Sequence, residues 1–170
     1  CIEFSESGLD PIVAREAQNF SLSPPEARIW RGMGVPFQFV NGWKSSSIEM
    51  EQVSKWVKSG CLISEVAESW IQAGLSSQLY EKWKQVTTNS EKVAKCELHS
   101  ISPETLSLWS TNFWNSHPFE LVLSWINERV NPNIAYLWVR NNIPVSIGAK
   151  WARTSKSEIL IFNGKEFDWA

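Results

Sequence analysis

The chain has 170 residues, of which 43% are hydrophobic, so it is long enough to bury a substantial core within one compact unit. Lysine and arginine number 16 against 18 aspartate and glutamate, and the formal net charge is -2 with both signs scattered along the chain. This balance argues against nucleic acid and an anionic membrane as partners. The sequence contains no run of about 18 to 20 apolar residues that would predict a membrane span, and no secretion signal.

Tryptophan recurs along the chain at a nearly constant interval. From Trp30 onward the steps are 13, 13, 14, 13, 26, 16, 13 and 13 residues, and Cys96 stands in the vacant place within the step of 26. The same count carried backward reaches Ala17 and Phe4. Such self-similarity at a fixed period is typical of stacked repeats. We call this place the tryptophan position of each unit and predict that it forms the core; its occupants are Trp30, Trp43, Trp56, Trp70, Trp83, Cys96, Trp109, Trp125, Trp138 and Trp151.

Each unit reads as one short helix followed by a turn. A small or aliphatic residue stands three positions before the tryptophan position, as with Ala27 and Val40, and residues three or four apart share one face of a helix. In most copies another apolar residue stands eight positions before it, as with Leu22 and Val35, and is predicted to pack where the helix begins. The unit is therefore a helix of about ten residues plus a turn of about three.

The first units carry the clearest start and stop signals. Residues 7–20 are a degenerate copy that begins at Asp10, before a proline. Ser23, followed by two prolines and Glu26, matches a capping box and starts the helix of Trp30. Glycine four residues after the tryptophan position predicts the end of three helices, because glycine enters the left-handed conformation at little cost. These glycines are Gly34, Gly60 and Gly74.

The middle of the chain departs from the period. Ser102 and Asn131, each followed by proline, predict the starts of two later helices, but the step from Trp109 to Trp125 is three residues longer than the others. This irregular segment, residues 110–119, is either a packing adjustment that bends the stack or a long turn on a binding face. In the second case its candidates for contact with a partner are Phe113, Trp114, His117 and Phe119.

The repeat is predicted to end at residue 156. Residues 157–170 lose the helical pattern and carry an apolar run, Ile159 to Phe162, followed by Asn163 and Gly164, a strong short-turn signal. We expect a small hairpin, the start of a following segment or an irregular cap that closes the last unit.

The three cysteines are too few for a disulfide framework and favour the cytoplasm or another reducing compartment. Cys96 and His99 have the spacing of two metal ligands, but zinc needs three or four and His117 is the only other histidine. A core thiol and a surface imidazole are therefore expected. The start at Cys1 suggests a processed product or a piece of a longer chain or assembly; a lipoprotein would follow that residue with a polar tether, whereas here Ile2 follows.

No sequence motif indicates a catalytic or cofactor-binding site. There is no phosphate-binding glycine loop, no HExxH, no nucleophile elbow and no pair of CxxC motifs, so we predict no enzyme, no metal and no cofactor.

The fold predicted is all-α: a right-handed or tightly wound α-solenoid of about ten to twelve single-helix repeats. Known solenoids build each unit from two or three helices in about 33 to 47 residues, so spacing alone leaves open whether two or three units make one turn. No residue type alternates between odd and even units, which argues against two distinct helix roles. The predicted function is protein interaction or scaffolding. The alternative is single-stranded nucleic-acid binding with one aromatic ring per repeat.

Overall fold

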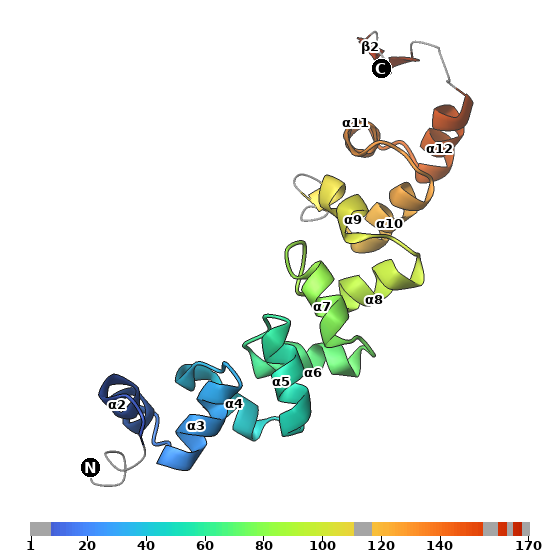
Figure 1. Ribbon diagram of the computed structural model, residues 1–170. Coiled ribbons are helices and arrows are strands. Elements are labelled where there is room, and N and C mark those ends of the chain that lie inside the picture. Colours follow the sequence, from blue (N-terminus) through green and yellow to red (C-terminus); the bar gives the residue numbers. More distant parts are fainter. Residues whose placement is uncertain (1–7, 111–116, 155–159, 163–164, 168–170) are drawn as a thin grey trace. The chain divides into compact units, whose positions relative to one another are not determined.

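The computed structural model describes residues 8–110, 117–154, 160–162 and 165–167, and is mostly helical over them (Figure 1). The prediction of an all-α chain of short helices is confirmed. The eleven helices of these described residues are α2 Pro11–Asn19, α3 Pro24–Gly32, α4 Phe37–Ser45, α5 Met50–Lys58, α6 Ser64–Gln72, α7 Ser77–Trp83, α8 Ser90–Leu98, α9 Pro103–Ser110, α10 Phe119–Asn127, α11 Pro132–Arg140 and α12 Val145–Thr154.

The helices follow the tryptophan period in register. Each described helix begins six residues before its tryptophan position, as α3 does at Pro24 before Trp30 and α10 does at Phe119 before Trp125. The additional residues between Trp109 and Trp125 therefore lie between α9 and α10, and both helices keep their position relative to the tryptophan position. A helix of this length is only about 15 Å long and does not persist alone in water, so its neighbours must stabilise it.

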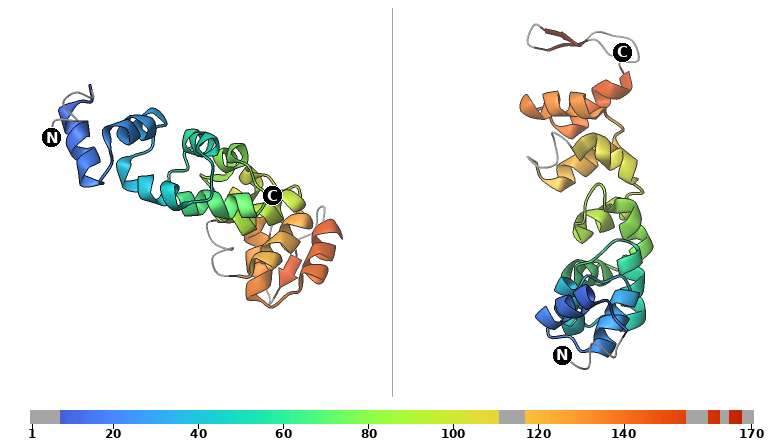
Figure 2. Two further views of the ribbon diagram at one scale, coloured as in Figure 1. Left: turned by 90° about the horizontal axis from the view of Figure 1, so that it is seen from below. Right: turned by 60° about the vertical axis from the view of Figure 1, so that its left-hand side comes forward.

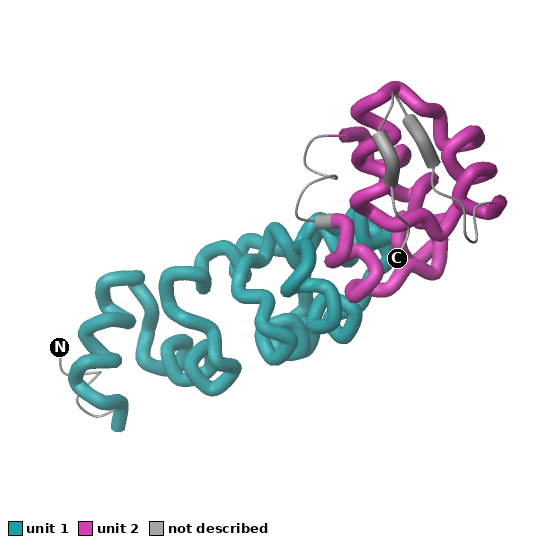
Figure 3. The backbone as a smooth tube through the Cα atoms, turned by 90° about the horizontal axis from the view of Figure 1, so that it is seen from above, with its two compact units in different colours: residues 1–94 teal, residues 95–170 magenta. Residues whose placement is uncertain are grey.

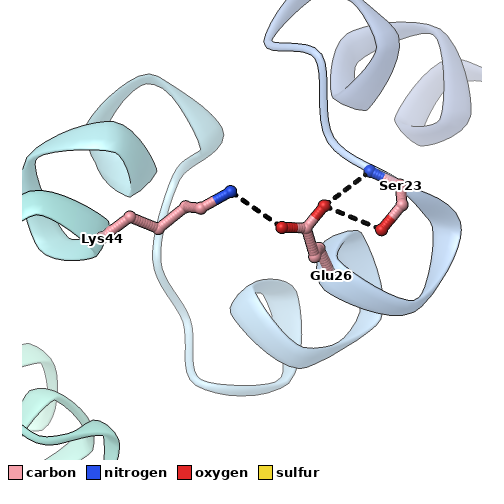
Figure 4. Close-up of polar contacts among 3 residues, drawn as sticks. All are labelled: Ser23, Glu26 and Lys44. Carbon is pink, nitrogen blue, oxygen red and sulfur yellow. Dashed lines mark hydrogen bonds and ion pairs between the residues drawn. The ribbon is translucent and has the colours of Figure 1, made fainter.

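Side chains predicted as caps fix several helix starts. The carboxylate of Glu26 accepts hydrogen bonds from the backbone N–H of Ser23 at 2.9 Å and from its hydroxyl at 2.7 Å (Figure 4). The other oxygen of Glu26 pairs with Lys44 Nζ at 2.8 Å and so ties α3 to α4. Asp10 and Asn131 accept the second backbone N–H of their helices, each at 2.9 Å. These contacts satisfy donors that a helix leaves open at its first turn.

One turn geometry ends most of the helices. Gly34, Gly60 and Gly74 have φ of 81°, 91° and 73°, as predicted for helix stops. The N–H of the following residue then bonds the carbonyl at the tryptophan position, as Val35 N does with Trp30 O at 3.0 Å. Four residues other than glycine also have a positive φ four residues after the tryptophan position, which the sequence did not indicate. They are Ser21, Ser100, Arg129 and Asn142. The turn is therefore set by its hydrogen bonds and not by glycine alone.

The core is formed where the helices meet. The residue three positions before the tryptophan position is buried in every described helix, including Ala27, Val53 and Leu106. The occupants of the tryptophan position from Trp30 to Trp138 are buried as well, and Trp151 in α12 is half-buried. These two positions form a continuous apolar face on each helix.

The chain divides into two compact units, residues 1–94 and 95–170, with the boundary inside α8 (Figure 3). In the first unit α2 contacts α3, α3 contacts α4, and α4 contacts α6; in the second unit α10 contacts α12. Figure 2 shows the ribbon of the chain from two further directions. Hydrogen bonds and ion pairs also join repeats that are two apart along the chain. They are Trp43 with Leu62, Ser47 with Glu68, Ser59 with Lys84, Trp70 with Thr88, Lys95 with Glu120, His99 with Asn127, and Glu128 with Arg153.

Helix contacts therefore run both to the next helix and to the next but one. The expectation that the units share a single helix role stays a prediction, because a residue pattern that is the same in every unit is compatible with both kinds of contact.

The last described elements are two short strands. β1, Leu160–Phe162, pairs antiparallel with β2, Lys165–Phe167, with Leu160 opposite Phe167. This matches the hairpin expected at the end of the chain, while the turn residues Asn163 and Gly164 lie outside the described part.

Candidate functional site

The rings at the tryptophan position from Trp30 to Trp138 are covered by protein. Trp70, Trp83 and Trp125 have no exposed surface, and Trp138, the most exposed of the buried rings, retains 7%. A ring that stacks on a nucleotide base must present one open face, so these rings are not placed to act as stacking platforms. They serve the core, with the largest apolar area that one side chain offers.

Two indole groups also form hydrogen bonds to the repeat two further along the chain. Trp43 Nε1 donates to the carbonyl of Leu62 at 3.0 Å, and Trp70 Nε1 donates to the carbonyl of Thr88 at 2.8 Å. Each acceptor lies two residues before the first residue of a helix two units further on. Trp125 occupies the matching place in α10, but its Nε1 has no hydrogen-bond partner among the described residues.

An aromatic cluster joins α5, α6 and α7. Trp56, Trp70 and Tyr80 make edge-to-face contacts, with ring centroids 5.1 to 6.5 Å apart. Burial raises the pKa of Tyr80 to about 12, and the neighbouring Cys61 adds to the shift. Burial also raises the pKa of the Cys61 thiol. Both groups therefore stay protonated and neutral at physiological pH, as a packed core requires.

Most of the irregular segment lies outside the described residues. Phe113 and Trp114 lie outside the described residues. His117 is half-buried before α10, and Phe119, the first residue of that helix, is buried in the core. The structure thus places Phe119 with the packing residues, while a role for the other three in binding stays a prediction.

Cys96 and His99 do not form a metal site with their described neighbours. Burial raises the pKa of Cys96 to about 12, and His99 Nδ1 lies 3.3 Å from the amide nitrogen of Asn127. Nowhere among the described residues do three or more potential ligands gather around a common point.

Two hollows adjoin one another between α4, α5 and α6. The first has a volume of about 360 Å³ and the second about 230 Å³, and Glu68 lines both. We call the two together the α4–α6 groove. Its lining residues are Asn41, Gly42, Ser45, Ser46, Ser47, Ile48, Glu49, Gln52, Ser64, Glu65, Glu68, Ile71 and Gln72.

Small side chains shape the floor of the groove. A Cβ atom on Gly42 would lie 2.7 Å from Ser64 Oγ, so glycine at residue 42 leaves room for the Ser64 hydroxyl between α4 and α6. Ser64, the first residue of α6, is buried and donates a hydrogen bond to Glu65 at 3.1 Å. The carboxylate of Glu68 accepts the backbone N–H of Ser47 at 3.1 Å, which fixes its position at the junction of the two hollows.

The groove carries negative charge. Glu49, Glu65 and Glu68 line it, and its described lining includes no lysine, arginine or histidine. The nearest cations along the chain are paired elsewhere: Lys44 with Glu26 at 2.8 Å and Lys55 with Glu51 at 2.9 Å. None of the three groove carboxylates takes part in a described ion pair.

Apolar side chains complete the second hollow. Ile48 and Ile71 line it, and Ile71 leaves 44% of its surface exposed. The groove thus combines open aliphatic surface with carboxylates at its junction and rim. Sequence reasoning missed this site because its residues come from three helices and show no motif of their own.

A third hollow, of about 220 Å³, lies between α2, α3 and the start of α4. It is lined by Val13, Val35 and Phe37 together with the oppositely charged Glu16 and Arg31. Because its charges balance, it offers less selectivity than the α4–α6 groove.

No described helix combines the length and the apolar character needed to cross a bilayer. Comparisons of the chain with models of protein families, with curated proteins and with solved structures found no match.

Proposed function

We propose that this chain is a helical repeat domain that binds a protein partner, and that the α4–α6 groove is its docking surface. The observation that carries the proposal is the groove itself, which is open, partly apolar and negatively charged. Protein-binding sites commonly combine exposed apolar area with a polar rim. Stacked helices serve this role well because they present a long ridged surface.

The alternative of single-stranded nucleic-acid binding has less support. Its mechanism needs exposed aromatic rings beside a basic stripe, whereas the rings at the tryptophan position are buried and the groove is acidic. Acidic side chains repel the phosphate backbone. An enzyme also has less support. The Ser64 hydroxyl bonds the Glu65 carboxylate at 3.1 Å, but Ser64 is buried at the start of α6, and the described lining of the groove supplies no histidine or lysine to complete a catalytic set.

The free thiols fit the expected compartment. Cys61 and Cys96 form no disulfide, which supports a reducing location for the proposed binding domain.

Selection from a library of random peptides tests the proposed function. The chain is screened as it stands, and selected peptides are then measured against Ser45→Trp, which fills the groove from an exposed position. Gln85→Trp is the matched control, because Gln85 is also exposed and also stands two residues after the tryptophan position. Peptides that bind the native chain and the control but not Ser45→Trp support the proposal. Failure to select any peptide, or binding that Ser45→Trp leaves intact, overturns it.

A further inference from the structure

We propose that the α4–α6 groove recognises a basic segment of its protein partner, with a lysine or arginine stem lying on Ile48 and Ile71 and its charged end beside Glu68. This inference rests on the proposed function and adds the chemical class of the partner.

Charge complementarity is the first argument. Glu68 lies where the two hollows meet, Glu65 lines the first and Glu49 lines the second. Bringing an acidic segment into this space would place like charges within a few ångströms of one another, while a cation gains favourable interactions with all three carboxylates. Since neither Lys44 nor Lys55 is paired with these groups, a partner cation does not have to displace one.

The apolar lining is the second argument, and it selects among polar partners. Lysine and arginine bury long aliphatic stems while their charged ends stay beside polar groups. The second hollow offers matching surfaces, because Ile48 and Ile71 line it together with Glu49 and Glu68. A purely apolar segment would cover the isoleucines but would also remove water from Glu68 without replacing its interactions, which is unfavourable.

The fixed position of Glu68 is the third argument. Its carboxylate already accepts the Ser47 N–H at 3.1 Å, so one oxygen is anchored and less side-chain freedom is lost when a cation binds. The hydrogen bond also makes a conservative test possible, because glutamine at this position keeps an acceptor for Ser47 and removes only the charge.

The test compares Glu68→Gln with a control in the same register. Glu81 stands two residues before the tryptophan position in α7, as Glu68 does in α6, and it is exposed and outside the groove. The probes are three short fluorescent peptides that share leucine and serine residues and carry lysine, glutamine or glutamate at the remaining places. Binding of each peptide to the native chain, Glu68→Gln and Glu81→Gln is measured by fluorescence anisotropy at low and moderate salt.

The lysine peptide is expected to bind tightest, to weaken with salt and to lose up to about fivefold in affinity with Glu68→Gln, the range of one exposed ion pair. Adding Glu49→Gln should weaken it further, while Glu81→Gln leaves it unchanged. The inference is overturned if Glu68→Gln binds the lysine peptide as tightly as the native chain does, or if the neutral peptide binds as well as the lysine peptide.

The two proposals fail in different ways. If the neutral peptide binds as well as the lysine peptide and Ser45→Trp abolishes that binding, the basic partner is overturned and the groove is retained as the docking surface. If no probe and no selected peptide binds in a manner that Ser45→Trp disrupts, both proposals are overturned.

Discussion

The indole N–H of Trp70 in α6 donates a hydrogen bond to the carbonyl of Thr88 at 2.8 Å, just before α8 begins. The bond joins two units that are not consecutive, and Trp43 makes the equivalent bond to Leu62. A side chain that fills the core thus also fixes how alternate helices lie against each other.

The missing bond of Trp125 predicts a difference among tryptophan substitutions. Trp43→Phe and Trp70→Phe each lose apolar area and one hydrogen bond, whereas Trp125→Phe loses area but also removes a buried donor without a described partner. We expect Trp125→Phe to cost about 1 to 2 kcal/mol less than the other two. Urea unfolding of the three variants measures this. An equal or greater cost for Trp125→Phe would show that its N–H is satisfied in solution.

Replacement of Gly148 by alanine is predicted to lower the stability of the folded chain. A Cβ atom at this place in α12 would lie 2.6 Å from Trp125 Cη2 and closer still to the ring of Trp138. Alanine favours a helix over glycine by about 1 kcal/mol, but aromatic rings held in a core cannot move aside cheaply. We expect Gly148→Ala to destabilise the chain by about 1 to 3 kcal/mol.

The control for that variant is Gly32→Ala. Gly32 ends α3, and a Cβ atom there meets no atom within 4 Å. Thermal unfolding should show no loss for Gly32→Ala. Equal loss in both variants would mean that the helix and not the ring contact decides the effect.

Acid is predicted to weaken the link between α3 and α4. Hydrogen bonds from Lys44 and then from Ser23 lower the pKa of Glu26 from 4.5 to about 2. A lowered folded-state pKa means that the contribution of Glu26 is complete above about pH 4.5 and is lost as the pH falls toward about 2. Across that window, native stability in urea should fall more steeply than the stability of Glu26→Gln.

Lys44→Met separates the causes of this shift. Because Lys44 is the largest contributor to the lowered pKa, its removal should bring the acid dependence close to that of Glu26→Gln. An unchanged pH profile in Lys44→Met would instead assign the effect to the helix cap at Ser23.

The two described cysteines are predicted to resist alkylation. Cys61 and Cys96 are 1% and 0% exposed, and burial raises both pKa values, that of Cys96 to about 12. Because the thiolate is the reactive form, iodoacetamide should label neither residue in the folded chain and both in urea. Peptide mass spectrometry resolves the two sites. Rapid labelling of Cys96 under native conditions would place it at an accessible position.

Local signals made the helices predictable. Ser23 before prolines, Asn131 before proline and the glycine stops act within one turn of chain, so their effect is the same wherever the unit lies. The same is true of the left-handed turn, but Arg129 and Asn142 adopt it without glycine because the turn's own hydrogen bonds compensate, and no composition rule marks them.

The candidate site was not predictable in this way. In the sequence Glu68 is a charge on the surface of a helix and Ser47 is a hydroxyl in a turn. Only the packing of α6 beside α4 brings the Glu68 carboxylate to 3.1 Å from the backbone nitrogen of Ser47. The candidates that the sequence indicated lie in the irregular segment instead. Phe119 is buried, His117 is half-buried, and Phe113 and Trp114 lie outside the described part.

The sequence by itself determined the period, the phase of each helix and the face that each helix buries, because spacing along a helix fixes which side chains share a face. The tertiary structure alone decided that alternate helices pair, that Trp70 finds a carbonyl while Trp125 finds none in the described structure, and that a groove opens beside Gly42. Those outcomes depend on distances between residues about 20 or more positions apart, and a repeated local pattern carries no information about how closely such residues approach.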